Sequence, residues 1–545
     1  TYLGKIKMIY IDPPYNTGKD FVYEDDFKQS VEEYMENSGQ YDEEGNRLEK
    51  NLESNGRFHT DWLNMMYPRL KLARNLLSDD GVIFISIDDN EQENLKKICD
   101  EIFGMGNFVT QFVWEKKKKP SFLNKNIGTK FEYIVVYSKD RNNSYAFSVN
   151  ITTKGKKYPF NNAGNGLSLL KFPPKSVKFI NMRDGIVKKQ NMSEKNIKTI
   201  LINDFEIKDG TNTQEFVLNG EWRYNQSSLN QFIKENKKIT ISKIPFRPNL
   251  LKEGGEIKKM HNLLTTYFYN TPTNEDATEE IINLLGGDYF EYVKPVGLIS
   301  FITKSYTYNN KDAIILDFFS GSATTAHATM QLNAEDGGNR KFILVQLPEN
   351  LDESLKKASD NAKKTIENAI KFLDSINRPH LLTEIGKERI RRAGKKILEE
   401  NKDKEGIENL DTGFRVLKVD SSNMKDVYYA PQELNKKNIF SYVDNIKEGR
   451  SSMDLLFQVM LDLGISLSSK IEEKDISGKK VFTVDGNFLI ACFDSDIDDE
   501  VINNIAEKKP IFAVFKNKSF TKDSPLANLE EIFKTVSPDT VRKIL

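Results

Sequence analysis

A short apolar stretch that runs into two prolines constrains the start of this chain more than any other feature. Residues 6–11 are mostly apolar and β-branched, over a length that favours a strand. The next four residues are Asp12, Pro13, Pro14 and Tyr15. The prolines fix φ and prevent the strand from continuing, so the sequence predicts a rigid turn at its carboxyl end. In open α/β sheets, ligands bind at that end of the strands.

This turn presents a carboxylate, a carbonyl and an aromatic ring, which together suit chemistry on the amino group of a base. Such an amino group is a poor nucleophile, because its lone pair is delocalised into the ring. Asp12 and the Pro13 carbonyl can each accept one N–H, which concentrates the lone pair toward an electrophile. Tyr15 can stack on an extruded base, a contact worth ~1–3 kcal/mol, comparable to the cost of extrusion. The alternative is an ordinary structural turn.

A second strand and turn lie far downstream. Residues 313–317 are predicted to form a buried strand, 318–325 a turn of small residues, and 326–332 a helix. Small residues let the backbone approach a ligand, and a helix N-terminus favours a carboxylate. The turn lacks the Gly-Lys-Ser/Thr of a P-loop and the third glycine of the dinucleotide fingerprint. A structural turn is again the alternative.

The two motifs together resemble the β-class S-adenosylmethionine-dependent DNA amino-methyltransferases. More closely, the chain is similar to the Mod subunits of type III restriction–modification systems. Further similar runs are residues 341–349 (Lys-Phe-Ile-Leu-Val-Gln-Leu-Pro-Glu), 383–392 (Thr-Glu-Ile-Gly-Lys-Glu-Arg-Ile-Arg-Arg) and 411–416 (Asp-Thr-Gly-Phe-Arg-Val). The motifs occur in the same order over most of the chain, and the match is weakest over 141–285.

The resemblance implies an α/β fold with a Rossmann-like, doubly wound methyltransferase sheet and a circularly permuted motif order. Alternating strands and helices in residues 1–140 agree with such a sheet. The expected domains are a catalytic half (1–140), an inserted α+β target-recognition domain (141–285), a cofactor half (286–375) and a C-terminal oligomerisation or partner domain (376–545). Because the family has a strand and helix before the first motif, we also expect an N-terminal segment to be missing here.

The resemblance also assigns roles to residues. The expected catalytic residues are Asp12, Pro13, Pro14 and Tyr15. The expected cofactor-binding residues are Lys294, Pro295, Asp317, Phe319, Ser320, Gly321, Ser322, Gln346 and Glu349. Either Gln346 or Glu349 would hold the ribose. Ala323 stands where relatives commonly have Gly, and Phe131 stands where they often have His.

The charge distribution indicates where DNA would bind. Residues 111–260 contain 29 Lys and Arg against 13 Asp and Glu, a net charge of +16, whereas the rest of the chain carries −17. A basic region in an otherwise acidic protein is typical of phosphate binding. Within it, Lys116, Lys117, Lys118 and Lys119 form a cationic loop that would face DNA. A solvated lysine-rich surface is the alternative reading.

Other compositional features limit the classes of protein to consider. The two cysteines are far apart, and the four histidines are scattered singly, so no metal-ligand spacing occurs and no metal is expected. No run of about 18 apolar residues is present, so no membrane span is expected. A chain of 545 residues is too long for one core. We expect a cytoplasmic protein.

The sequence therefore predicts a site-specific adenine-N6 DNA methyltransferase that uses S-adenosyl-L-methionine. Its expected partners are double-stranded DNA with a flipped adenine, a second copy in a homodimer and a restriction subunit with helicase and nuclease activity. Two alternatives stay open: a cytosine-N4 DNA methyltransferase, and a DNA-binding specificity subunit that does not methylate.

Overall fold

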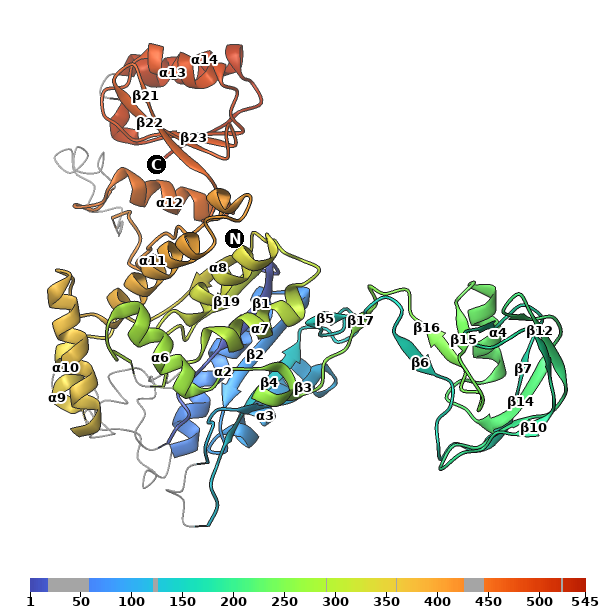
Figure 1. The fold of residues 1–545 in the computed structure, drawn as a ribbon. Helices are drawn as coiled ribbons and strands as arrows, with labels where there is room; N and C mark the ends of the chain where they lie inside the picture. Colours follow the sequence, from blue (N-terminus) through green and yellow to red (C-terminus); the bar gives the residue numbers. More distant parts are fainter. Residues whose placement is uncertain (18–57, 121–125, 291, 359, 426–445, 521–522) are drawn as a thin grey trace. The chain divides into compact units, whose positions relative to one another are not determined.

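A computed structural model describes residues 1–17, 58–120, 126–290, 292–358, 360–425, 446–520 and 523–545 (Figure 1). Contacts divide the described chain into two compact units. The larger is Lys5–Thr412, and the smaller joins Thr1–Gly4 to Gly413–Leu545. The sequence prediction placed the start of the C-terminal domain at residue 376, whereas 376–412 belong to the larger unit.

The larger unit is built on a seven-stranded sheet of order β18-β3-β4-β2-β1-β19-β20. Only β4 runs antiparallel to its neighbours. The carboxyl ends of the other six strands therefore lie at one edge, which is also where β4 begins. The strands are β18 (Leu263–Leu264), β3 (Phe108–Glu115), β4 (Phe131–Ser138), β2 (Leu77–Ile87), β1 (Ile6–Ile11), β19 (Ile314–Asp317) and β20 (Lys341–Leu344).

The predicted α/β character of this unit is confirmed. All six residues of β1 are buried, as expected for a parallel strand covered on both faces. Helices α7 and α8 pack on the sheet, where Leu298 and Ile302 join Met8, Phe84 and Ile315 in one apolar core. The helices associated with the sheet are α2 (Phe58–Leu76), α3 (Gln92–Cys99), α7 (Val296–Thr307) and α8 (Thr324–Asp336).

The middle of the chain forms a body with its own core (Figure 1). It contains a four-stranded sheet, a mixed seven-stranded sheet and α4 (Gln226–Lys234). Phe172, Phe205 and Phe216 stack at its centre. Its strands are β6 (Lys157–Pro159), β7 (Leu167–Phe172), β8 (Lys178–Phe179), β9 (Gly185–Val187), β10 (Gln190–Asn191), β11 (Thr199–Leu201), β12 (Phe205–Lys208), β13 (Thr211–Asn212), β14 (Phe216–Glu221), β15 (Ile239–Ile241) and β16 (Asn249–Leu251).

The flanks of the predicted recognition domain, 141–285, pack instead with the central sheet. Tyr145, Phe147 and Met260 pack against the core of that sheet, and β18 is one of its strands. A short ladder of β5 (Asn150–Ile151) and β17 (Ile257–Lys258) connects the two parts. After β18 come α5 (Thr266–Tyr269) and α6 (Asn274–Leu285), the latter in contact with α11.

Helices complete the larger unit after β20. Helix α11 (Leu382–Glu400) contacts α8, α6 and α10, which is why residues 382–400 belong to this unit. The others are α9 (Leu351–Lys357) and α10 (Asp360–Ser375).

The smaller unit is an α/β body with apolar clusters on both faces of a five-stranded sheet. Its strands are β21 (Ile471–Ile476), β22 (Lys479–Val484), β23 (Leu489–Cys492), β24 (Phe512–Phe515) and β25 (Val541–Ile544). Its helices are α12 (Ser452–Asp462), α13 (Asp499–Glu507) and α14 (Asp523–Val536). In neither unit does the described chain include a helix with the length and apolarity that a membrane span requires.

Candidate active site

The two predicted motifs meet at the carboxyl edge of the central sheet. Strand β1 pairs in parallel with β19, with Met8 opposite Ile315 and Ile9 opposite Leu316. Asp12 directly follows β1, and Asp317 is the last residue of β19. Two segments about 300 residues apart in sequence therefore place their carboxylates at one site, as ligand binding in an open α/β sheet requires.

Asp12 is held by a lysine that sequence analysis assigned to the cofactor. Lys294 Nζ donates to both carboxylate oxygens of Asp12, each at 2.9 Å. The Lys294 side chain is only 7% exposed, whereas that of Asp12 is 25% exposed. Burial raises the pKa of Asp12, and the Lys294 charge opposes that rise. A ligand can thus approach the carboxylate, while Lys294 stabilises its charge from the protein side.

Tyr15 and Glu132 extend this site. The Tyr15 hydroxyl donates to Asp12 Oδ1 at 3.0 Å and lies 3.3 Å from Glu132 Oε2. Burial raises the pKa of Tyr15 well above its ordinary value, so the phenol stays protonated and donates. Lys294 Nζ lies 5.1 Å from the centre of the Tyr15 ring and 5.9 Å from that of Trp114. The Tyr15 ring is thereby fixed beside the carboxylate.

The proline turn is anchored by the helix that follows it in the described chain. Trp62 Nε1 of α2 donates to the Pro14 carbonyl at 2.7 Å. Asn16 adopts a positive φ of 58° and donates its side-chain amide to Phe58 O and to Glu91 Oε1. Pro13 is buried, and no described donor bonds its carbonyl. These contacts fix the direction of the turn and leave the Pro13 carbonyl available.

Asp317 organises the second motif. Its oxygens accept from Phe319 N–H at 3.1 Å and from Thr325 Oγ1 at 2.6 Å. Burial nevertheless raises the pKa of Asp317 to about 7. The carboxyl thus ties the strand end to the start of α8, and a cationic group bound beside it would favour its ionised form.

The loop between β19 and α8 is stabilised from two sides. Gly321 N–H donates to Gln346 Oε1 at 2.8 Å, so the oxygen of Gln346 supports the loop backbone. Arg389 of α11, which is fully buried, donates to Ser322 Oγ and to Thr324 Oγ1, both at 2.7 Å. Burial lowers the pKa of Arg389 to about 10, which still leaves it charged at neutral pH.

Ala323 occupies a left-handed backbone conformation, with φ of 63°, at the N-cap of α8. A glycine adopts this conformation without steric cost, whereas alanine does not. The requirement for positive φ therefore gives a physical reason for the glycine that relatives commonly have here. The Ala323 Cβ lies 3.5 Å from where a Cβ on Gly386 would stand, so it packs against α11.

The remaining predicted cofactor residues differ in burial and in position. Ser320 and Ser322 are buried, and Phe319 is half-buried. Pro295 is the N-cap of α7 and follows Lys294 directly. Glu349 is exposed and accepts from Ser354 Oγ, five residues along the chain.

These residues fit a ligand that carries an ammonium, a carboxylate and hydroxyl groups, as S-adenosylmethionine does. Asp317 supplies an anion, and the α8 N-terminus suits a carboxylate. Gln346 keeps its amide N–H groups for a hydroxyl after its oxygen bonds Gly321. In the part of the chain that the structure describes, no cluster of His, Cys, Asp and Glu could hold a metal ion.

The four lysines that were predicted to face DNA have different contacts in the structure. Lys116 donates to Glu132 at 2.8 Å and is part of the Asp12 site. Lys118 pairs with Asp276 of α6. Lys117 and Lys119 line a hollow of about 400 Å³ beside α6, and neither is in an ion pair with a described residue.

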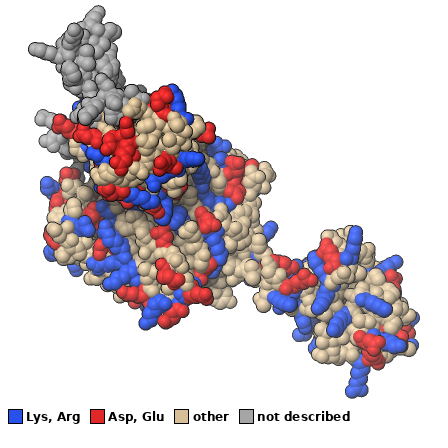
Figure 2. Space-filling view, turned by 90° about the horizontal axis from the view of Figure 1, so that it is seen from above, with Lys and Arg blue, Asp and Glu red and all other residues tan. Residues whose placement is uncertain are grey.

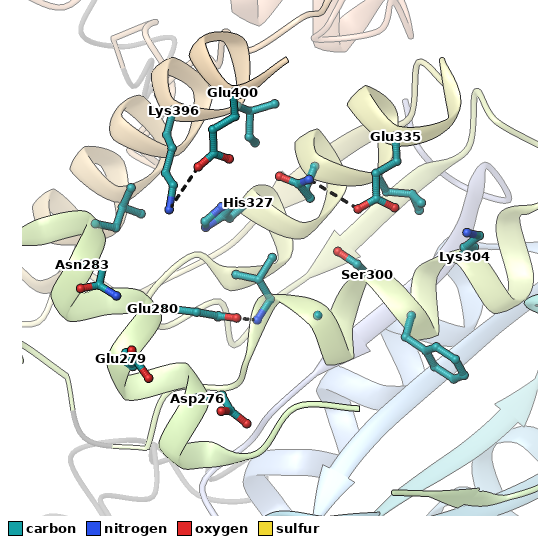
Figure 3. Close-up of a pocket in the computed structure, with 17 residues that line it drawn as sticks. Asp276, Glu279, Glu280, Asn283, Ser300, Lys304, His327, Glu335, Lys396 and Glu400 are labelled. Atoms are coloured by element: carbon teal, nitrogen blue, oxygen red, sulfur yellow. Dashed lines mark hydrogen bonds and ion pairs between the residues drawn. The ribbon is translucent and has the colours of Figure 1, made fainter. Parts of the chain in front are cut away.

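A larger cavity of about 590 Å³ lies elsewhere, between α6, α7, α8 and α11 (Figure 3). Five carboxylates, two lysines and His327 line it, and neither Asp12 nor Asp317 does. Figure 3 shows Lys396 turned toward Glu400 and His327 lying below them. The predicted chemistry therefore belongs to the sheet edge and not to this cavity.

Sequence reasoning did not assign roles to Glu132, Trp62 or Arg389. Arg389 lies in the run 383–392, whose resemblance to the family was noted, and that resemblance was the available signal. Trp62 fitted the apolar spacing of α2, and nothing in that spacing indicated a bond to Pro14. Glu132 directly follows Phe131, which stands where relatives often have His, and that position next to a family motif was the available signal.

Comparisons with known proteins show which family this chain is similar to. The profile of a DNA methylase family, N6_N4_Mtase, matches residues 6–357. The StyLTI Mod subunit of a type III restriction–modification enzyme from Salmonella typhimurium is 36% identical over 423 residues. That match covers 76% of this chain and 57% of the relative.

Two further Mod subunits of type III restriction–modification enzymes match. EcoPI Mod of Escherichia phage P1 is 35% identical, over 64% of this chain and 55% of the relative. EcoP15I Mod of Escherichia coli is 30% identical, over 90% of this chain and 73% of the relative. The chain thus spans little more than half the length of the first two relatives.

Proposed function

Because this chain belongs to the DNA methylase family, among the Mod subunits of type III restriction–modification systems, we propose that it methylates N6 of adenine in DNA. The methyl donor is S-adenosyl-L-methionine. The observation that carries this proposal is the meeting of Asp12, Tyr15 and Asp317 at the carboxyl edge of the central sheet. That edge joins an acceptor set for an amino group to a loop that fits the cofactor.

Each residue of the first motif has a role in this reaction. Asp12 accepts one N–H of the adenine amino group, and the Pro13 carbonyl accepts the other. The lone pair of the nitrogen then points away from the protein acceptors. Tyr15 stacks on the extruded base, which compensates for part of the lost base stacking. The bound cofactor supplies the electrophile, a methyl group on a sulfonium.

The second motif holds the cofactor in this proposal. Asp317 faces the ammonium of its methionine part, and residues 319–322 with the α8 N-terminus cover that part. Gln346 is the better candidate for the ribose, because Glu349 is exposed and already bonds Ser354. The permuted motif order that the family resemblance implied is part of this proposal.

The basic middle of the chain is proposed to read the DNA sequence. Figure 2 shows Lys and Arg distributed over the visible face of the body that contains β6–β16. Lysines on phosphates position a protein and do not specify a sequence, so specificity would come from other side chains of this body. A homodimer, a cytoplasmic location and a restriction subunit as partner complete the proposal.

Two alternatives predict different results. A cytosine-N4 methyltransferase would use the same acceptor geometry on another base, although that subtype more often has Ser in place of Asp12. A specificity subunit without activity would follow if the Ala323 methyl group blocked the cofactor loop. The first alternative differs from the proposal in the methylated base, and the second differs from it in the absence of cofactor binding.

Sequencing that maps modified bases in DNA incubated with the protein and cofactor distinguishes these possibilities. We expect N6-methyladenine at one short sequence. Modification at cytosine N4 would establish the first alternative. DNA binding without modification, together with no heat of cofactor binding in calorimetry, would establish the second.

A further inference from the structure

Asp12 has more donors around it than the proposed reaction requires. A carboxylate offers about four lone-pair sites. Lys294 Nζ donates to both oxygens at 2.9 Å, and the Tyr15 hydroxyl donates to Oδ1 at 3.0 Å. Donors from the described residues therefore use three of these sites, which leaves one for an N–H of the target. The donors that are already present determine which direction that last site faces.

Lys294 also belongs to a chain of alternating charges. Its Nζ lies 3.8 Å from Glu132 Oε2, and Lys116 Nζ lies 2.8 Å from Glu132 Oε1. The side chains of Lys294 and Glu132 are 7% and 8% exposed. Two carboxylates and two ammonium groups thus neutralise each other in a largely buried place. Without Lys294, two carboxylates would share this region with one cation.

We propose that Lys294 is a positioning residue that keeps Asp12 ionised and aims its free lone pair at the target amino group. This inference deepens the proposed function and rests on it. It differs from the cofactor role that sequence resemblance gave to Lys294, because the contacts of its ammonium group with described residues are with Asp12, Glu132 and the rings of Tyr15 and Trp114. A neutral Asp12 would donate a proton where the reaction needs an acceptor.

Removal of Lys294 should therefore change how activity depends on pH. The groups that face Asp12 are Lys294, Glu132, Tyr15, Tyr10 and Asp317, with Lys116 and Asp88 beyond them. Burial and Glu132 raise the pKa of Asp12, whereas Lys294 and the Tyr15 hydroxyl lower it. Loss of the lysine charge removes the largest lowering contribution, so Asp12 would be protonated at higher pH than in the wild type.

The first test compares Lys294→Met with the wild type across pH. We expect the acidic limb of kcat to move to higher pH by about one unit or more, as for a carboxylate that loses a neighbouring cation. The dissociation constant for S-adenosylmethionine should change less than threefold. Lys304→Met removes a charge from helix α7, which begins two residues after Lys294, and should leave the pH profile unchanged, because Lys304 is not among the charges that shift the pKa of Asp12. An unshifted limb with much weaker cofactor binding would overturn the proposal.

A second test does not depend on activity. Thermal unfolding at pH 8 is measured for Lys294→Met, Asp12→Asn and the double variant. Because Lys294→Met leaves a half-buried carboxylate without its partner, the unfolding midpoint of this variant should fall, and adding Asp12→Asn should recover at least half of the loss. Additive losses would show that the pair does not stabilise Asp12. If the wild type methylates nothing, the proposed function fails, and this cycle still decides whether Lys294 holds the charge of Asp12.

Discussion

Arg389 Nη1 lies 2.7 Å from Ser322 Oγ, although 67 residues separate the two in sequence. Both residues are buried, and the same Nη1 also reaches Thr324 Oγ1. A guanidinium of α11 therefore fixes the loop that we propose for the cofactor. This relationship makes the stability of the loop depend on a helix outside the two recognised motifs.

Replacing Arg389 by Met should weaken cofactor binding and lower stability together. Each charge-assisted hydrogen bond lost from a buried group costs ~1.5–3 kcal/mol, and both hydroxyls lose their bond to the guanidinium. Calorimetry with S-adenosylmethionine and thermal unfolding measure the two effects. Arg391→Met, on the same helix with a side chain 40% exposed, is the matched control and should change neither. Cofactor binding at wild-type strength in Arg389→Met would show that the loop is held by other contacts.

Tyr15 offers two separable contributions, its ring and its hydroxyl. Tyr15→Ala should reduce the hold on an extruded adenine by ~1–3 kcal/mol, whereas Tyr15→Phe keeps the stacking ring. The phenylalanine variant loses only the bonds to Asp12 and Glu132. A fluorescent base analogue at the target position reports extrusion in both variants. Equal signals from Tyr15→Ala and the wild type would mean that another group covers the base.

The lysine loop should act through Lys117 and Lys119 more than through its other members. Neutralising these two should lower affinity for all DNA sequences alike and reduce the salt dependence, by roughly 0.9 in log K per lost phosphate contact for each decade of salt. Lys118→Gln is the matched control, because Lys118 is paired with Asp276. Titrations of DNA binding at several salt concentrations measure the slopes. A greater loss for Lys118→Gln would contradict this assignment.

His327 should destabilise the larger unit in acid. Burial, with the charges of Arg389 and Lys396, lowers the pKa of His327 to about 3. A histidine with a depressed pKa folds neutral, so stability is lost as pH falls below the unfolded value of about 6.5. His327→Gln removes this effect. Between pH 8 and pH 5, the free energy of unfolding of His327→Gln should therefore rise relative to that of the wild type by at most ~2 kcal/mol. Parallel pH curves in denaturant unfolding would show that His327 titrates normally.

Local sequence predicted the elements of the site better than their contacts. The strand at residues 6–11 and the strand that ends at Asp317 follow from apolar runs of the right length, and both occur in the structure. The Lys294–Asp12 pair spans 282 residues, and no local pattern determines such a pairing. The ion pairs of Lys116 and Lys118 likewise depend on Glu132 and Asp276, which belong to other elements.

The boundaries of the inserted body also could not be predicted from local sequence. The family resemblance placed the target-recognition domain at residues 141–285, but β18 and α6 within that range pack with the central sheet and with α11. A two-residue strand such as Leu263–Leu264 has too little sequence to be recognised by periodicity. Its place in the sheet results from pairing with Val113 and Trp114.

The central claim is that Asp12 accepts a hydrogen from the target amino group, and Asp12→Ala tests it most directly. Methyl transfer to DNA is measured together with the binding of S-adenosylmethionine and of DNA. We expect transfer to fall by at least roughly a hundredfold, as for loss of a positioned catalytic group, with both affinities within a few-fold of wild type. Asp79→Ala, an exposed carboxylate near the opposite end of β2, should have no effect on transfer. Wild-type turnover in Asp12→Ala would contradict the mechanism.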